Sequence, residues 1–189
     1  MARSEAATRH AAYAARFADV AAGVRDWAAP TPVKEWTARD VVAHLTTWFP
    51  EFLAAGGVQV PAGDPDDPVG SWALQTLTIQ DLLDDEARAS EPFGHPRVPP
   101  QPLASAIDTF YTPDVFLHTW DLARSSGADD TLDATTCAEM LAGMESVEQL
   151  IRSSGQFGEQ QPVPDDATPQ QRLIAFIGRD PLWRPDVTR

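Results

Sequence analysis

The feature that most constrains the fold is the recurrence of apolar residues every three or four positions along several long segments. The first segment keeps this spacing from Ala6 to Trp27, with His10 in one place of the series, and Pro30 and Pro32 follow it. Such spacing gives a helix one apolar face, and proline ends it. No stretch of useful length alternates as a half-buried strand would. The sequence therefore predicts an all-α protein.

Capping residues and helix breakers divide the rest of the chain into further helices. Thr37 stands three residues before Asp40 in a capping-box relation, and Gly56 and Gly57 end that helix. We expect Leu74, Leu77 and Val147 to face inward on later helices. The helices are predicted at about 6–27, 37–55, 70–88, 103–126, 134–152 and, capped by Thr168 and closed by Gly178, 169–177.

This pattern predicts a four-helix bundle with an additional short C-terminal helix. The length suits a single domain, residues 1–189, with residues 156–189 as a C-terminal extension that packs on the bundle. Residues 91–102 contain five prolines and a glycine and are expected to form a loop or a short hairpin. Pro113 either kinks one long helix or follows a Thr112 cap as the first residue of a new helix.

Charge and composition exclude several classes of partner. The net charge is −14 and no Lys/Arg-rich stripe is present, which argues against nucleic acids and anionic membrane surfaces. No apolar run reaches the roughly 20 residues that span a bilayer, and the N-terminus lacks an apolar signal region. The single Cys137 excludes an internal disulfide and a cysteine-based metal site. We expect a cytoplasmic protein that is a monomer or a homodimer.

Three polar residues continue an apolar helical seam and form the candidate site. Asp114, His118 and Asp121 follow the stripe of the 103–126 helix, so they are expected to face inward. An Asp-x-x-x-His pair is often a surface ion pair, but a buried carboxylate costs several kcal/mol unless it is paired or bound to a metal. His44, in the apolar stripe of another helix, would complete a metal site of two histidines and one carboxylate.

The other candidate residues have less specific interpretations. Asp121 is either a fourth ligand, an acceptor for a ligand histidine's ring N–H, or a tie between helices; we favour the acceptor role. His10 would either line the pocket or stand at a helix boundary. His95 would either line the pocket or lie on the surface. Three tryptophans near the ligands belong to the core or line a substrate pocket: Trp36, Trp48 and Trp120.

Three segments together resemble a known family: WTARDVVAHL (36–45), DVFLHTWDLA (114–123) and GRDPLW (178–183). They are similar to the metal-binding domain of mycothiol-dependent maleylpyruvate isomerase, within the DinB/YfiT-like superfamily, and more similar still to its small single-domain branch. The resemblance spans almost the whole chain. It implies a divalent ion, most often zinc or nickel, on His44, Asp114 and His118. It also implies a mycothiol-type thiol that the metal activates for attack on an electrophile.

The sequence departs from that family at two places. Asp114 stands where the isomerase has Glu, and we see no equivalent of the isomerase's separate C-terminal domain, so maleylpyruvate isomerisation itself is not expected. The leading hypothesis is a metal-dependent thiol S-transferase that takes a small-molecule thiol and an electrophilic substrate. The alternatives are a non-catalytic metal-binding or stress-response protein, and a hydrolase in which the metal activates water.

Overall fold

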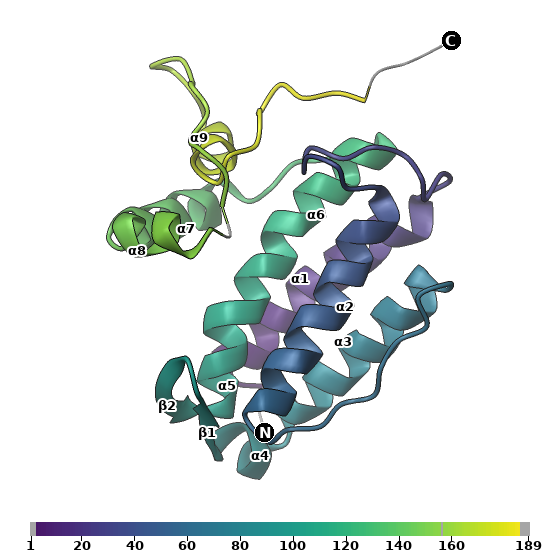
Figure 1. The fold of residues 1–189 in the computed structure, drawn as a ribbon, viewed down its shortest axis with the longest axis vertical. Helices are drawn as coiled ribbons and strands as arrows, with labels where there is room; N and C mark the ends of the chain where they lie inside the picture. Colours follow the sequence, from purple (N-terminus) through teal and green to yellow (C-terminus); the bar gives the residue numbers. More distant parts are fainter. Residues whose placement is uncertain (1–2, 156, 186–189) are drawn as a thin grey trace.

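Four long helices form a bundle in the computed structural model, which describes residues 3–155 and 157–185. They are α1 (Glu5–Gly23), α2 (Ala38–Ala55), α3 (Pro68–Asp84) and α6 (Thr112–Ser126). Both α1 and α2 pack against α3 and α6, so the four helices enclose one core (Figure 1). The predicted all-α bundle is confirmed. Residues 1–2, 156 and 186–189 of the expected domain and its extension lie outside the described residues.

Shorter elements connect the bundle helices and follow them. The proline-rich stretch is an antiparallel hairpin in which Phe93 pairs with Gln101 and His95 with Val98. Of the expected loop or short hairpin, the hairpin is therefore the one that forms. Within the described ranges, no helix is long and apolar enough to cross a membrane. The shorter elements are α4 (Glu86–Ser90), β1 (Pro92–His95), β2 (Val98–Pro102), α5 (Leu103–Ala106), a π-helix η1 (Ile107–Tyr111), α7 (Ala134–Glu145), α8 (Glu148–Ser154) and α9 (Pro169–Phe176).

Side-chain caps fix the predicted helix starts. Thr37 accepts a hydrogen bond from the backbone N–H of Asp40, and the Asp40 carboxylate accepts one from the backbone N–H of Thr37. Thr168 and Gln171 form the same reciprocal pair at the start of α9. Each pair satisfies backbone donors that would otherwise lack partners at a helix start. These local contacts explain why both starts were predictable from the sequence.

Helix α1 ends four residues before the position that its apolar spacing predicts. The chain turns extended at Val24, and the carbonyl oxygen of Trp27 accepts from the backbone N–H of Arg39 at the start of α2. Trp27 still packs against the core. The prediction that this helix continues to residue 27 is therefore wrong. The apolar spacing continues into residues 24–27, but the backbone leaves the helix at Val24 and bonds to α2 through Trp27.

Three leucine and valine positions predicted to face inward are exposed. Leu74, Leu77 and Val147 expose 37%, 64% and 47% of their surface. On α3, the spacing also places Trp72 and Leu83 inward; both are buried, and Ile79 is buried beside them. Val147 lies where the predicted 134–152 helix breaks into α7 and α8.

The predicted 70–88 helix is also divided. The Asp85 side chain accepts from the backbone N–H groups of Ala87 and Arg88, which ends α3 and starts α4. Aspartate is a strong helix cap, so one side chain here overrides the helical spacing around it.

One π-helical turn, η1, comes directly before Pro113 in the long helix that ends with α6. Thr112 has helical backbone angles (φ −58°, ψ −41°), and no side-chain cap is present at the start of α6, so the alternative of a new helix capped by Thr112 is wrong. The helix continues from Leu103 to Ser126, as the other alternative had it. Proline lacks an N–H and clashes with the carbonyl four residues earlier. The wider π-turn Ile107–Tyr111 lies where that carbonyl belongs and accommodates the ring.

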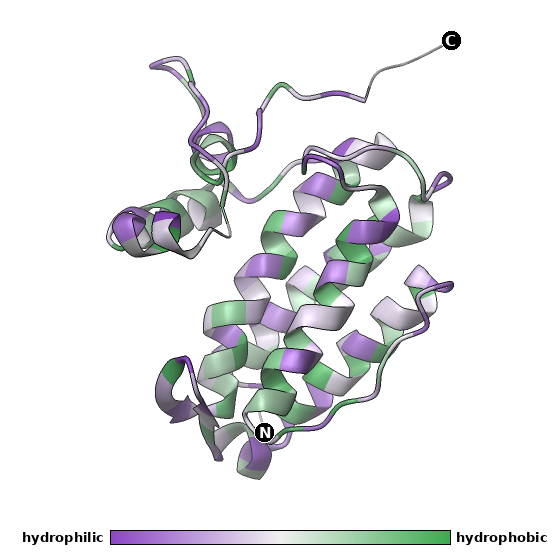
Figure 2. Ribbon diagram, viewed as in Figure 1, coloured by the Kyte–Doolittle hydropathy of each residue, from purple (hydrophilic) through white to green (hydrophobic). Residues whose placement is uncertain are grey.

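Helix α6 is shared by two apolar cores, and Figure 2 shows hydrophobic residues interleaved with hydrophilic ones along it. One face contributes to the bundle core with Val115 and Leu122. Another face packs Phe116 and Trp120 against residues of the C-terminal helices such as Ile174. Because both sides are covered, polar side chains of α6 are also taken out of water, and these are the residues of the candidate site.

Candidate metal centre

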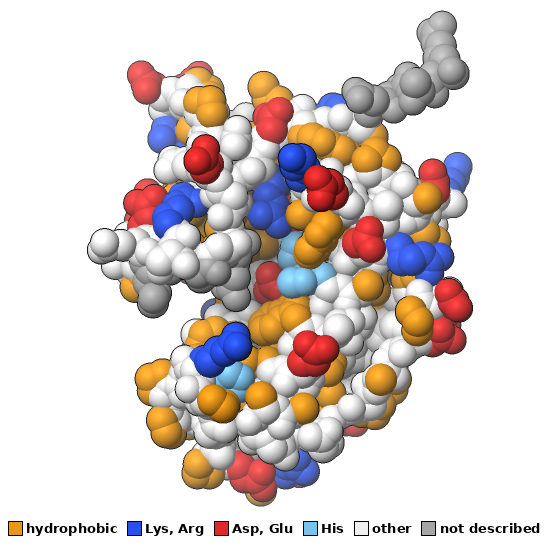
Figure 3. Space-filling view, viewed as in Figure 1, with side chains coloured by type: hydrophobic (Ala, Val, Ile, Leu, Met, Phe, Trp, Pro, Cys, Tyr) orange, Lys and Arg blue, Asp and Glu red, His pale blue; other side chains and the backbone are white. Residues whose placement is uncertain are grey.

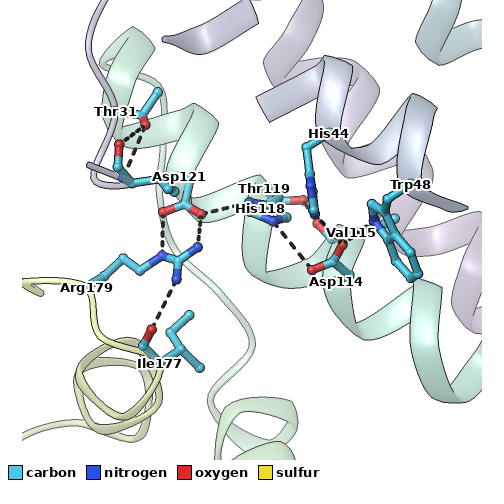
Figure 4. Close-up of polar contacts among 11 residues, drawn as sticks. Thr31, His44, Trp48, Asp114, Val115, His118, Thr119, Asp121, Ile177 and Arg179 are labelled. Carbon is cyan, nitrogen blue, oxygen red and sulfur yellow. Dashed lines mark hydrogen bonds and ion pairs between the residues drawn. The ribbon is translucent and has the colours of Figure 1, made fainter. Parts of the chain in front are cut away.

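Two helices bring the three candidate ligands together. His44 comes from α2, and Asp114 and His118 stand one turn apart on the facing side of α6 (Figure 4). The Nε2 atom of His44 lies 3.2 Å from Oδ2 of Asp114, and Nε2 of His118 lies 3.4 Å from Oδ1. One ligand atom from each residue lies within 4.8 Å of the others.

These distances are compatible with a shared metal ion as well as with hydrogen bonds between the side chains. Two ligand atoms about 2.1 Å from a tetrahedral zinc ion stand about 3.4 Å apart, close to both carboxylate–imidazole distances here. Among the described residues, no Lys or Arg forms an ion pair with Asp114. The donor set of two imidazoles and one carboxylate is one that zinc prefers. The residues therefore fit a divalent ion.

One side of the site is open. The side chains of His44 and Asp114 are 30% and 22% exposed, whereas His118 is 5% exposed. Figure 3 shows histidine surface in a hollow at the middle of this face, with apolar side chains beside it. Trp36 lies against both imidazoles, with its ring centroid 5.0 Å from His44 and 5.7 Å from His118. A bound ion would thus keep a position accessible from solvent.

Asp114 is held as a carboxylate. Burial works to raise its pKa, but attraction to His118, the hydrogen bond and attraction to His44, and the Trp48 indole together outweigh burial and lower the pKa. The Trp48 Nε1–H donates to Oδ2 at 2.9 Å. An ionised carboxylate is the form that binds a metal.

Asp121 lies on the far side of His118, away from the other two ligands. Its fully buried carboxylate meets Nδ1 of His118 at 2.9 Å, while Nε2 of the same ring faces Asp114. With a proton on Nδ1, the lone pair of Nε2 is free for a metal. Such a contact is the one that a ring N–H acceptor makes, and the acceptor role of Asp121 stays a prediction.

Among the described residues, Arg179 also reaches the centre, and the sequence did not single it out as a site residue. Its Nε and Nη2 lie 3.4 Å and 3.3 Å from the two oxygens of Asp121. Burial works to raise the pKa of Asp121, and the charge of Arg179 with the His118 contact outweighs it. The sequence indicated that a buried carboxylate such as Asp121 needs a partner. The spacing of residues could not indicate that Arg179 is this partner.

The other expected pocket residues lie elsewhere. His10 is fully buried and bonds to Gln80. His95, on the hairpin, stacks on Phe52 at 4.3 Å. Trp120 is buried in the second core, beneath the Arg124 guanidinium. Of the residues expected to line the pocket, Trp36 and Trp48 contact ligand side chains, whereas His10, His95 and Trp120 do not.

Cys137, on α7, lies in the second apolar core. It is fully buried, and burial raises the pKa of its thiol to about 11. The thiol of this chain is therefore protonated at neutral pH and is no nucleophile.

Comparison with known proteins shows the family to which the chain belongs. The family described as mycothiol maleylpyruvate isomerase N-terminal domain matches residues 10–92, which include His44. Two uncharacterized proteins, from two strains of Mycobacterium tuberculosis, are each 30% identical over 174 residues, covering 89% of this chain and 92% of the relative. No solved structure matches the chain significantly. The chain therefore belongs to the mycothiol maleylpyruvate isomerase N-terminal domain family, a DinB-like, metal-binding family.

Proposed function

We propose that the protein binds one divalent ion, zinc or nickel, through His44, Asp114 and His118, and uses it to activate a mycothiol-type thiol for transfer to an electrophile. The convergence of the three ligand atoms at a half-exposed position carries this proposal. A fully enclosed set of four ligands would favour a structural ion, whereas three ligands with an open side are typical of catalytic sites. Asp121 does not join the three, because it faces the other ring nitrogen of His118.

The bound ion would lower the pKa of a thiol at its open position, so that the nucleophilic thiolate forms near neutral pH. The chain supplies the orientation. Asp121 directs Nε2 of His118 toward the centre, and the Trp48 N–H fixes one oxygen of Asp114. Family membership supports mycothiol as the thiol, since the family's description names it.

An aromatic surface beside the site suits an apolar electrophile. The half-buried side chains of Trp48 and Phe52 follow His44 at successive four-residue steps along one face of α2. Their ring centroids lie 6.0 Å apart, and Phe52 in turn stacks on His95 of the hairpin. Half-exposed aromatic rings offer apolar contact area to a ligand at little entropic cost. The electrophile would lie along this surface with its reactive carbon toward the thiolate.

Metal content tests the site directly. Purified protein is loaded with zinc, desalted and analysed for bound metal, together with His118→Ala and a control, His95→Ala. We expect one ion per chain in the wild type and in the control, and a large loss in His118→Ala because a ligand is missing. Equal metal content in the wild type and His118→Ala would refute the assignment.

A conjugation assay tests the chemistry. Metal-loaded protein is mixed with mycothiol and an activated chloroarene; the thiolate sulfur forms a bond to the ring carbon, and chloride leaves with the bonding electron pair. We expect thiol loss and chloride release in equal amounts, above the rate with metal-free protein. No thiol consumption across several electrophiles, with one bound ion per chain, would overturn the transferase and favour the non-catalytic alternative.

A further inference from the structure

The C-terminal segment 178–183 reaches the metal centre through one side chain. The backbone N–H of Arg179 donates to the carbonyl of Ile174, and its Nη1 donates to the carbonyl of Ile177. Gly178 makes this turn with φ +88°, and a Cβ there would lie 2.6 Å from Cα of Gly158. Glycine is therefore required just before Arg179. The arginine is held at both its backbone and its guanidinium.

The guanidinium meets a carboxylate that has no contact with water. The side chain of Asp121 is 0% exposed, and among the described residues His118 and Arg179 are the side chains that bond it. An unpaired buried charge costs several kcal/mol, so without the arginine the carboxylate would move toward solvent or lose its charge. Either change would alter the group that orients His118 (Figure 4).

We propose that Arg179 is a positioning residue for the metal centre, acting through Asp121 on the ligand His118. Its two contacts hold both oxygens of Asp121, so that Oδ2 stays 2.9 Å from Nδ1 of His118 and Nε2 stays directed at the other ligands. This inference rests on the proposed metal site. In this proposal, the segment after α9 helps to orient a metal ligand, although the three ligands themselves lie on the bundle helices α2 and α6.

A purely structural role for Arg179 predicts a different result. Arg152 provides the comparison, because its guanidinium donates to the carbonyls of Phe176 and Gly158 and so holds the same part of the chain. It has no contact with Asp121. If Arg179 only anchors the C-terminal segment, Arg152→Met and Arg179→Met should affect the centre alike.

The experiment measures cobalt(II) binding to the full-length chain by chelator competition and by the visible absorption of bound cobalt, which reports ligand geometry. Loss of a residue that orients a ligand typically weakens metal binding 10- to 100-fold. We expect Arg179→Met to bind cobalt about tenfold more weakly, with a changed spectrum. Arg152→Met should keep the wild-type affinity and spectrum. Arg179→Lys keeps a positive charge but lacks the two parallel N–H donors of a guanidinium, so its cobalt affinity should lie between those of the wild type and Arg179→Met.

A double variant separates positioning from loss of fold. In an Asp121→Asn background, Arg179→Met should weaken cobalt binding no further, because the two residues act in one chain of contacts. Unchanged affinity and spectrum in Arg179→Met, equal losses in Arg179→Met and Arg152→Met, or additive losses in the double variant would each overturn the inference. A wild-type chain that binds no cobalt or zinc would instead refute the metal site itself, and the positioning role with it.

Discussion

His10 should make the folded protein sensitive to mild acid. The ring is fully buried between α1 and α3, and its Nδ1–H donates to Oε1 of Gln80 at 2.8 Å. Its Nε2 has no hydrogen-bond partner among the described residues. A second proton would place an unsatisfied N–H and a charge in the core. Burial accordingly lowers the pKa of His10, although Gln80 and Asp84 oppose this.

The size of the effect follows from the unfolded chain. A histidine with the ordinary pKa of 6.5 takes up a proton on unfolding at low pH, whereas His10 in the folded state resists it. Stability is therefore complete above the unfolded pKa and is lost as the pH falls below it, down to the lowered folded pKa. Between about pH 7.5 and about pH 5 the loss from this residue is at most about 2 kcal/mol.

Urea unfolding at the two pH values measures this loss. It is done on metal-free wild type and His10→Gln, so that His44, His95 and His118 contribute equally to both proteins. We expect the wild type to lose up to about 2 kcal/mol more than the variant on acidification. The same pH dependence in both proteins would refute the reasoning, whatever the absolute stability of the variant.

Two further substitutions test contacts described above. Thr37→Ala removes the cap of α2 and should lower the free energy of unfolding by about 1 kcal/mol in urea titrations; an unchanged midpoint would contradict the capping role. Trp48→Phe removes the indole donor to Asp114 and should weaken zinc binding about tenfold in a competition titration. Trp120→Phe is its control, since no partner of the Trp120 N–H is found among the described residues, and equal zinc affinities in the two variants would contradict the role of Trp48.

The elements that the sequence predicted well are those with local causes. Thr37 with Asp40, and Thr168 with the residues after it, cap helices through contacts within one turn. The helical period predicted an inward direction for Asp114 and His118, and both lie at the site, although α6 is buried on more than one side.

The predictions that were wrong depended on tertiary contacts. Apolar spacing implied burial at Leu77 and Val147, but no element within residues 3–155 and 157–185 covers those positions. Trp27 is packed as its spacing suggested, yet its backbone bonds to α2 instead of forming another helical turn. The contact of Arg179 with Asp121 joins residues 58 positions apart, and no local pattern encodes such a pair.

The π-turn at Ile107–Tyr111 has a consequence for how this chain can change in evolution. A π-turn holds one residue more than an α-helical turn, and each residue turns a helix by about 100°. Deleting one residue there would rotate the hairpin and α5 against the half of the helix that carries Asp114 and His118. A substitution at an exposed position of the segment, such as Thr109, changes no helical step and leaves that angle intact. Lineages that keep the site should therefore vary the composition of this segment more freely than its length.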